Sequence, residues 1–151
     1  MWNIIYGLVI SQLDYANSLY IGLPECDLKK LRRVQGLAAK IVLKSEENSL
    51  AGLKKLHWLS ISLRIKFKIL TLLYKSLHGL SPEYIRAMVE LHTPERTGLR
   101  SENIFLHLKV PNIKRKTFAA RSYSIVAPIW WNKLPNTIKQ KPTILTFLKQ
   151  N

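Results

Sequence analysis

The side chains of this sequence that could do chemistry are four histidines, one cysteine and nine carboxylates. A zinc site needs three or four Cys, His or carboxylate ligands at short, regular intervals. None of the histidines has such neighbours at ligand spacing, so no metal site is predicted. They are His57, His78, His92 and His107. Cys26 has no histidine near it in the sequence that could activate it as a nucleophile, and we expect an ordinary thiol.

Carboxylates and glycines give no active site either. Two-metal phosphoryl transfer needs clustered carboxylates that hold cations about 4 Å apart. The adjacent acids Glu46 and Glu47 lie in a polar stretch, and the aspartates Asp14 and Asp27 are far apart. No glycine-rich phosphate loop occurs, because the six glycines are scattered. We therefore predict no enzymatic activity and no cofactor.

The charge is strongly positive and unevenly spread. Lys and Arg number 24 against 9 acids, which gives a net charge of +15. Residues 1–50 carry 6 basic and 5 acidic side chains, whereas residues 101–151 carry 9 and 1. Such a charge favours a polyanionic partner, nucleic acid first and anionic membrane second. A merely soluble basic domain is the alternative, and composition alone does not exclude it.

Length and composition predict one packed domain. A chain of 151 residues that is 47% hydrophobic is long and apolar enough to bury a core. It contains no internal repeat or long linker, so residues 1–151 are predicted to form a single domain. The single cysteine is typical of an intracellular, reducing compartment. The apolar residues 1–10 lack the flanks of a leader and are too few to span a membrane, so we expect a core helix cut off at its start.

Helical periodicity dominates the first half of the chain. A helix is predicted over residues 2–20, ending before Gly22 and Pro24, and Asp27 is predicted to cap a second helix over 28–44. The apolar face of that second helix carries Leu28, Leu31, Val34, Ala38, Ile41 and Val42, and its basic back carries Lys29, Arg33, Lys40 and Lys44. Most such basic faces are simply solvated, and a minority bind phosphates.

Residues 61–69 alternate as a strand does, but a longer window favours a helix. Polar residues at 64, 68, 71 and 75 form one helical stripe, which predicts a helix over about 61–78 with Gly79 as its stop. Ser81 is predicted to cap the next helix, with Pro82 in its first turn.

The last third of the sequence mixes patterns. Residues 104–110 alternate and end before Pro111, which predicts a short strand. Residues 117–131 are predicted to be helical, with Pro128 bending or ending the helix, and a short amphipathic segment follows Pro142. The predicted fold class is therefore mainly α, a helical bundle-like domain with a short β element near residues 104–110.

Five stretches, taken together and in this order, resemble a known family. They are "SQLDYANSLYIGLP" (11–24), "LKKLRRVQGLAAKIV" (28–42), "LKKLHWLSISLRIKFKIL" (53–70), "LLYKSLHGLSPEYI" (72–85) and "APIWWNKLP" (127–135). The chain resembles the region just after the polymerase core in reverse transcriptases of LINE-type, non-LTR retrotransposons, of the chicken-repeat and jockey kind. Its matching signature residues are His57, Trp58, Pro128, Trp131, Asn132 and Pro135. Ser60 departs from the pattern, since proline is common there.

The resemblance implies a thumb-like helical region that holds RNA or DNA by its backbone. The implied contacts are Arg64, Lys68, Lys75, Lys109, Lys114, Arg115, Lys116 and Arg121. The family's paired catalytic aspartates lie upstream of this region and have no counterpart here, so no polymerase activity is expected. A further implied partner is the polymerase core itself. Trp131 is expected to pack in the hydrophobic core of this domain. The alternative is that its ring is a platform on which bases stack.

Two other functions compete with nucleic-acid binding. The chain could be a structural or interaction remnant of a mobile element, whether decayed or taken over by a host. It could also bind anionic membrane through its basic amphipathic helices. We rank membrane binding lowest of the three functions, because Lys and Arg are scattered over several elements and the apolar faces are needed for a core.

Overall fold

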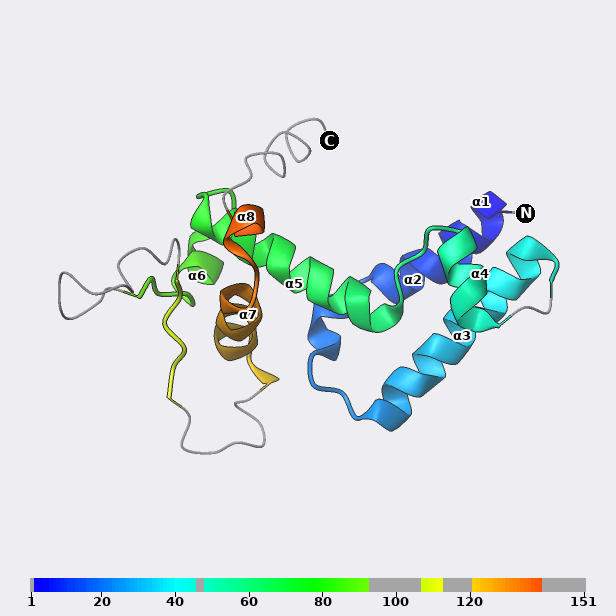
Figure 1. Cartoon of the computed structure of the whole chain (residues 1–151), viewed down its shortest axis with the longest axis horizontal. Coiled ribbons are helices and arrows are strands. Elements are labelled where there is room, and N and C mark those ends of the chain that lie inside the picture. Colours follow the sequence, from blue (N-terminus) through cyan, green and yellow to red (C-terminus); the bar gives the residue numbers. More distant parts are fainter. Residues whose placement is uncertain (1, 46–47, 93–106, 113–120, 140–151) are drawn as a thin grey trace. The chain divides into compact units, whose positions relative to one another are not determined.

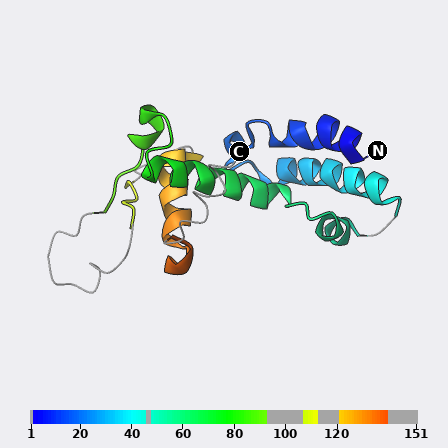
Figure 2. The ribbon, with the colours of Figure 1, turned by 90° about the horizontal axis from the view of Figure 1, so that it is seen from above.

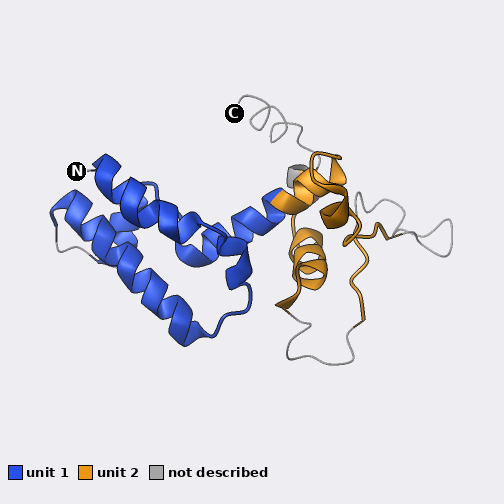
Figure 3. Ribbon diagram, turned by 180° about the vertical axis from the view of Figure 1, so that it is seen from behind, with its two compact units in different colours: residues 1–71 blue, residues 72–151 orange. Residues whose placement is uncertain are grey.

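A computed structural model describes residues 2–45, 48–92, 107–112 and 121–139 of the chain. These residues are mainly helical, as the sequence predicts (Figure 1). They divide into two compact units, residues 1–71 and residues 72–151 (Figure 3). Each unit is described by itself below, and the single domain inferred from the sequence stays a prediction.

Unit 1 begins with an interrupted helical segment. It consists of α1 (Trp2–Ile5), a π-helical turn (Tyr6–Ile10) and α2 (Ser11–Asp14). The helix ends there because the backbone turns left-handed at Ala16, with φ +48°. A 3-10 helix (Asn17–Tyr20) follows. The continuous helix predicted up to residue 20 is therefore wrong in its last part.

The next helix, α3 (Glu25–Leu43), lies beside the first helical segment, and α4 (Ser49–Lys55) packs against it (Figure 2). Pro24 occupies the N-cap of α3, with no side-chain hydrogen bond to the first turn. The prediction that Asp27 caps this helix is therefore wrong. Asp27 lies inside the first turn, where its carboxylate pairs with the Lys30 ammonium at 3.0 Å.

The buried residues of α3 are small or polar, and of the predicted apolar face only Ala38 is among them, while Leu28, Leu31 and Val42 are half-buried. Gln35, Gly36, Ala38 and Ala39 are buried. Of the predicted apolar face, Val34 and Ile41 are 46% and 55% exposed. The small side chains let α4 come close: a Cβ added to Gly36 would lie 3.0 Å from the Cβ of Ser49 and would overlap its hydroxyl.

The helix predicted from the long polar stripe is confirmed. It is α5 (Ile61–Leu77), and its buried residues Ile61, Ile65, Ile69 and Leu73 recur every four positions. Gly79 ends it with φ +71°, and the Leu80 N–H donates to the Lys75 carbonyl at 2.8 Å. This is the left-handed stop predicted for that glycine.

A non-glycine residue makes the same kind of stop after α4. His57 has φ +55°, and its N–H donates to the Lys54 carbonyl at 3.1 Å. The Trp58 N–H then reaches back to the Leu53 carbonyl at 2.8 Å, which completes a Schellman motif. A Cβ is strained in this conformation, so the turn is formed at a cost that glycine would avoid.

Replacing His57 by glycine is therefore expected to raise the free energy of unfolding by about 0.5–1 kcal/mol. The measurement is urea denaturation followed by tryptophan fluorescence. His57→Ala is the control, because it removes the imidazole and keeps the Cβ, so it should leave stability unchanged. Equal stabilisation by both variants would show that the imidazole, and not the backbone, is the unfavourable group.

Unit 2 contains α6 (Glu83–Arg86), α7 (Tyr123–Asn132) and α8 (Asn136–Lys139). The prediction that Ser81 caps α6 is wrong, because Pro82 holds the N-cap position. The Ser81 hydroxyl bonds the Ser76 hydroxyl instead, at 3.0 Å.

The helix predicted over residues 117–131 is present as α7 from Tyr123 onward. Its buried Pro128 does not end it, because the helix continues to Asn132. Residues 117–120 and the segment after Pro142 lie outside the described residues.

The predicted β element is reduced to one antiparallel bridge in the part of the chain that the structure describes. Leu91 pairs with Leu108. The His92 N–H donates to the His107 carbonyl at 2.9 Å, and the Lys109 N–H donates to the Glu90 carbonyl at 3.0 Å. Residues 104–106 of the predicted strand lie outside the described residues.

Candidate nucleic-acid interface

The cations expected to contact nucleic acid are divided between the two units. Arg64 and Lys68 belong to unit 1, and the others belong to unit 2. The others are Lys75, Lys109, Lys114, Arg115, Lys116 and Arg121, of which residues 114–116 lie outside the described residues. The structure therefore does not gather the predicted residues into one described cluster.

Arg64 is engaged inside unit 1. Its guanidinium contacts the Asp14 carboxylate at 2.5 Å and donates to the Leu59 carbonyl at 2.8 Å. Only 13% of the Arg64 side chain is exposed, against 37% of Asp14. These bonds tie α2 to the start of α5, 50 residues apart in sequence. Arg64 is therefore held as a structural cation, away from an external phosphate.

We expect Arg64→Met to lower the free energy of unfolding by about 1–3 kcal/mol, because it leaves the Asp14 carboxylate without its ion-pair partner and the Leu59 carbonyl with the Gln35 amide as its one remaining donor among the described residues. Lys68→Met on the same helix is the matched control, since Lys68 is exposed and forms no hydrogen bond with a described residue. It should stay within about 0.5 kcal/mol of the parent chain. Equal losses in the two urea titrations would remove Arg64 from this structural role.

The other described cations of the predicted contact set are more accessible to a phosphate. Lys68 and Arg121 are exposed, and Lys75 is half-buried on α5. Lys109 pairs with Glu90 at 2.9 Å, but both side chains are more than 60% exposed. Such a surface pair is worth little, so a phosphate can replace the carboxylate.

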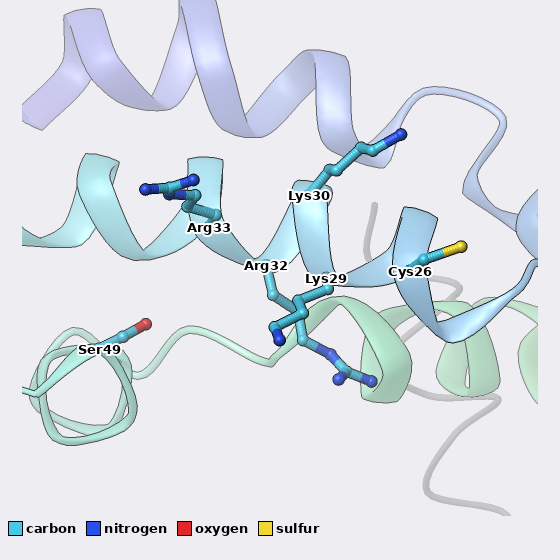
Figure 4. A pocket seen from close by; sticks show the side chains of 6 residues that line it. All are labelled: Cys26, Lys29, Lys30, Arg32, Arg33 and Ser49. Carbon is cyan, nitrogen blue, oxygen red and sulfur yellow. The ribbon is translucent and has the colours of Figure 1, made fainter.

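A basic pocket on α3 contains cations that the prediction did not rank. The pocket measures about 480 Å³ and lies within unit 1. Its lining is Cys26, Lys29, Lys30, Arg32, Arg33 and Ser49. Lys29 and Arg32 point to the same side of α3, whereas Lys30 points away from them (Figure 4). The signal in the sequence was the i, i+4 spacing of Lys29 and Arg33 on the basic back of this helix.

Ion pairs neutralise part of this pocket. Lys30 pairs with Asp27 at 3.0 Å. Arg32 pairs with Glu25, and its guanidinium also donates to the Ser62 hydroxyl at 2.8 Å. Lys29 and Arg33 form no ion pair with any residue that the structure describes. The pocket therefore keeps two positive charges without a counterion among the described residues.

His57 and Trp58, the first pair on which the resemblance was based, both have structural roles. His57 forms the left-handed turn after α4, and its side chain is exposed. The Trp58 ring is 93% buried and contacts the rings of Trp2 and Tyr6, with centroids 5.3 and 6.5 Å away. This aromatic cluster fastens the first helical segment to the chain after α4.

The residues around the paired tryptophans also have packing and hydrogen-bonding roles. Trp131 is 3% exposed, and its ring lies 6.4 Å from the Tyr74 ring. Asn132 accepts the Leu108 N–H at 3.0 Å and donates to the Leu108 carbonyl at 2.9 Å. Pro128 is buried and Pro135 is exposed. A ring as deeply buried as Trp131 packs in the core and offers no face to a base.

Two groups beside this signature have pKa values that burial depresses. Burial lowers the pKa of the His107 imidazole, and the positive charges of His92 and Lys139 lower it further. The His92 and His107 rings meet edge to face at 5.6 Å. Burial also lowers the pKa of the Lys139 ammonium, which donates to the Asn132 carbonyl at 3.5 Å.

Stability is therefore expected to fall as the pH drops from 7 towards 5. Unfolded His107 binds a proton near its ordinary pKa of about 6.5, whereas folded His107 binds it only at lower pH. The unfolded state thus holds more protons in this range and is favoured by acid. Urea titrations at the two pH values measure the effect, and His107→Gln should reduce it. An undiminished loss in that variant would assign the acid sensitivity to other groups.

The described residues contain no group of three or more His, Cys, Asp or Glu side chains that could hold a metal ion. No described helix is both long and apolar enough to cross a bilayer. No family model, no curated protein and no solved structure matches the chain.

Proposed function

We propose that this chain is a non-catalytic nucleic-acid-binding module that descends from a LINE-type reverse transcriptase. It holds RNA or DNA by the sugar-phosphate backbone, without preference for sequence and without polymerase activity of its own. Its positively charged helices would be the contact surface, and the polymerase core of the parent element a further partner.

The observation that supports this proposal is the state of the chain's carboxylates. Four of the five described acids, Asp14, Glu25, Asp27 and Glu90, already form ion pairs with basic side chains. The described residues hold 17 basic side chains against these five acids, so at least twelve of their positive charges have no acidic counterpart there. A polyanion such as a nucleic acid supplies the missing counterions.

A binding titration at several salt concentrations tests the proposal. A fluorescent single-stranded RNA of mixed sequence should bind, with log K falling by about 0.7 per neutralised phosphate for each unit of log salt. Scrambling the sequence should not change the affinity. Failure to bind in dilute buffer, or an affinity that does not respond to salt, would overturn the proposal. Primer extension by the purified chain would contradict the absence of polymerase activity.

A second function, that of a structural remnant, is favoured by exposed apolar side chains on the first helical segment, in the residues just after it and on α3. In unit 1 these include Ile4, Leu8, Tyr15, Leu19, Val34, Leu37 and Ile41, all at least 46% exposed. Large apolar side chains left exposed are available to a partner, which here would be the polymerase core of the parent element.

If the chain is a structural remnant, we expect the isolated protein to unfold with poor cooperativity and to self-associate. Thermal unfolding followed by calorimetry and by circular dichroism measures this property. A single sharp transition of a monomer, with equal calorimetric and van't Hoff enthalpies, would contradict it.

A further inference from the structure

The basic pocket on α3, defined above by its six lining residues, has the charge of an anion site. Lys29 and Arg33 lack an internal partner among the described residues, and they lie one helical turn apart. The two carboxylates of this region do not cancel their charge, because Asp27 is held by Lys30 and Glu25 by Arg32.

The lining also indicates which part of a nucleic acid would enter. Guanidinium, ammonium and hydroxyl groups line the pocket, and all of them donate hydrogen bonds to phosphate oxygens. None of the six lining residues is aromatic, so none of them offers a ring on which a base could stack. A phosphate fits this lining, and a base does not.

We propose that the α3 pocket is a phosphate-binding site for the backbone of a single-stranded nucleic acid, with Lys29 and Arg33 as its contacts. This inference rests on the proposed function and goes further by naming the site. The Arg32 guanidinium is oriented by its bonds to Glu25 and to the Ser62 hydroxyl, and it points to the same side of α3 as Lys29 (Figure 4).

The test compares two double variants of the full chain in the RNA titration. Lys29→Gln/Arg33→Gln should reduce the slope of log K against log salt by about 1.4, since two phosphate contacts are lost. Lys54→Gln/Lys66→Gln removes the same charge from exposed positions of unit 1 outside the pocket, and it should change the slope by less than half as much. Circular dichroism checks that both variants keep the parent's helical content.

Cys26 supplies a second readout, because it is the only cysteine of the chain, is exposed and lines the pocket. Saturating RNA should slow its alkylation by iodoacetamide several-fold in the parent chain and leave it unchanged in Lys29→Gln/Arg33→Gln. Vesicles of phosphatidylserine should give no protection. Protection by vesicles alone would overturn the nucleic-acid assignment.

The two proposals fail in different ways. If the parent chain binds RNA with a steep salt dependence while both double variants lose equal slope and Cys26 stays unprotected, the pocket is not the site. In that case the proposed function still stands. If the parent chain does not bind RNA, the proposed function fails and the site with it.

Discussion

Replacing Trp131 by alanine is expected to lower the free energy of unfolding by about 3–5 kcal/mol, the largest loss of any single substitution considered. The ring is 97% buried and packs beside Tyr74, so its removal loses apolar burial and leaves a cavity. Burial of the neighbouring Ile125, Val126 and Ala127 limits the collapse of that cavity. Urea denaturation measures the loss, and circular dichroism is the appropriate probe because the variant removes a fluorophore.

The adjacent tryptophan provides the control for this prediction. Trp130 is only half-buried, so Trp130→Ala should cost clearly less than Trp131→Ala. The two variants have the same composition and differ only in which face of α7 loses its ring. If Trp130→Ala proved the more damaging, Trp131 would not be the anchor of this helix.

Asn132→Ala is expected to cost about 2–4 kcal/mol, although it removes only a small polar side chain. The amide of Asn132 satisfies both the N–H and the carbonyl of Leu108, whose side chain is 1% exposed. Alanine leaves both backbone groups of this part-buried position without their partner, and each unsatisfied group costs about 1–3 kcal/mol.

Lys133→Ala, next to it and exposed, should change stability by less than about 0.5 kcal/mol. Asn132→Asp separates the two bonds, because a carboxylate accepts the Leu108 N–H but cannot donate to its carbonyl. We expect an intermediate loss for that variant. A stability equal to that of the parent in Asn132→Ala would show that water replaces the amide.

The helices of this chain were predictable where one polar stripe continues over many turns, and α5 is the example. A single stripe at residues 64, 68, 71 and 75 decides between helix and strand without knowledge of the neighbours. Helix starts were less predictable. Asp27 and Ser81 are favourable caps, but Pro24 and Pro82 occupy the N-caps instead, and neither helix has a side-chain hydrogen bond at that position.

The buried face of α3 could not be predicted from hydrophobicity, because it depends on which helix approaches. Ranking by apolar size selects Val34 and Ile41, which are exposed, over Gly36 and Ala39, which are buried. The close approach of Ser49 to Gly36 decides the orientation, and that contact is not local in sequence.

The candidate site was predictable in kind but not in place. Net charge indicates a polyanionic partner, yet the sequence does not show which cations already have a counterion. Arg64 was among the predicted contacts because of its position on the polar stripe, but Asp14, 50 residues away, holds it in an ion pair. Lys29 and Arg33 stand out only after Glu25 and Asp27 are assigned to their own partners.

The exposed apolar side chains of unit 1 have a practical consequence for purification. Washing with concentrated salt strips bound polyanions from a basic protein, because counterions screen its charge. The same salt removes the mutual repulsion between copies, and the uncovered Leu8, Leu37 and Ile41 are then free to adhere. Material freed of host nucleic acid in this way is expected to precipitate on concentration, whereas arginine-containing buffers or mild detergent should keep it dispersed.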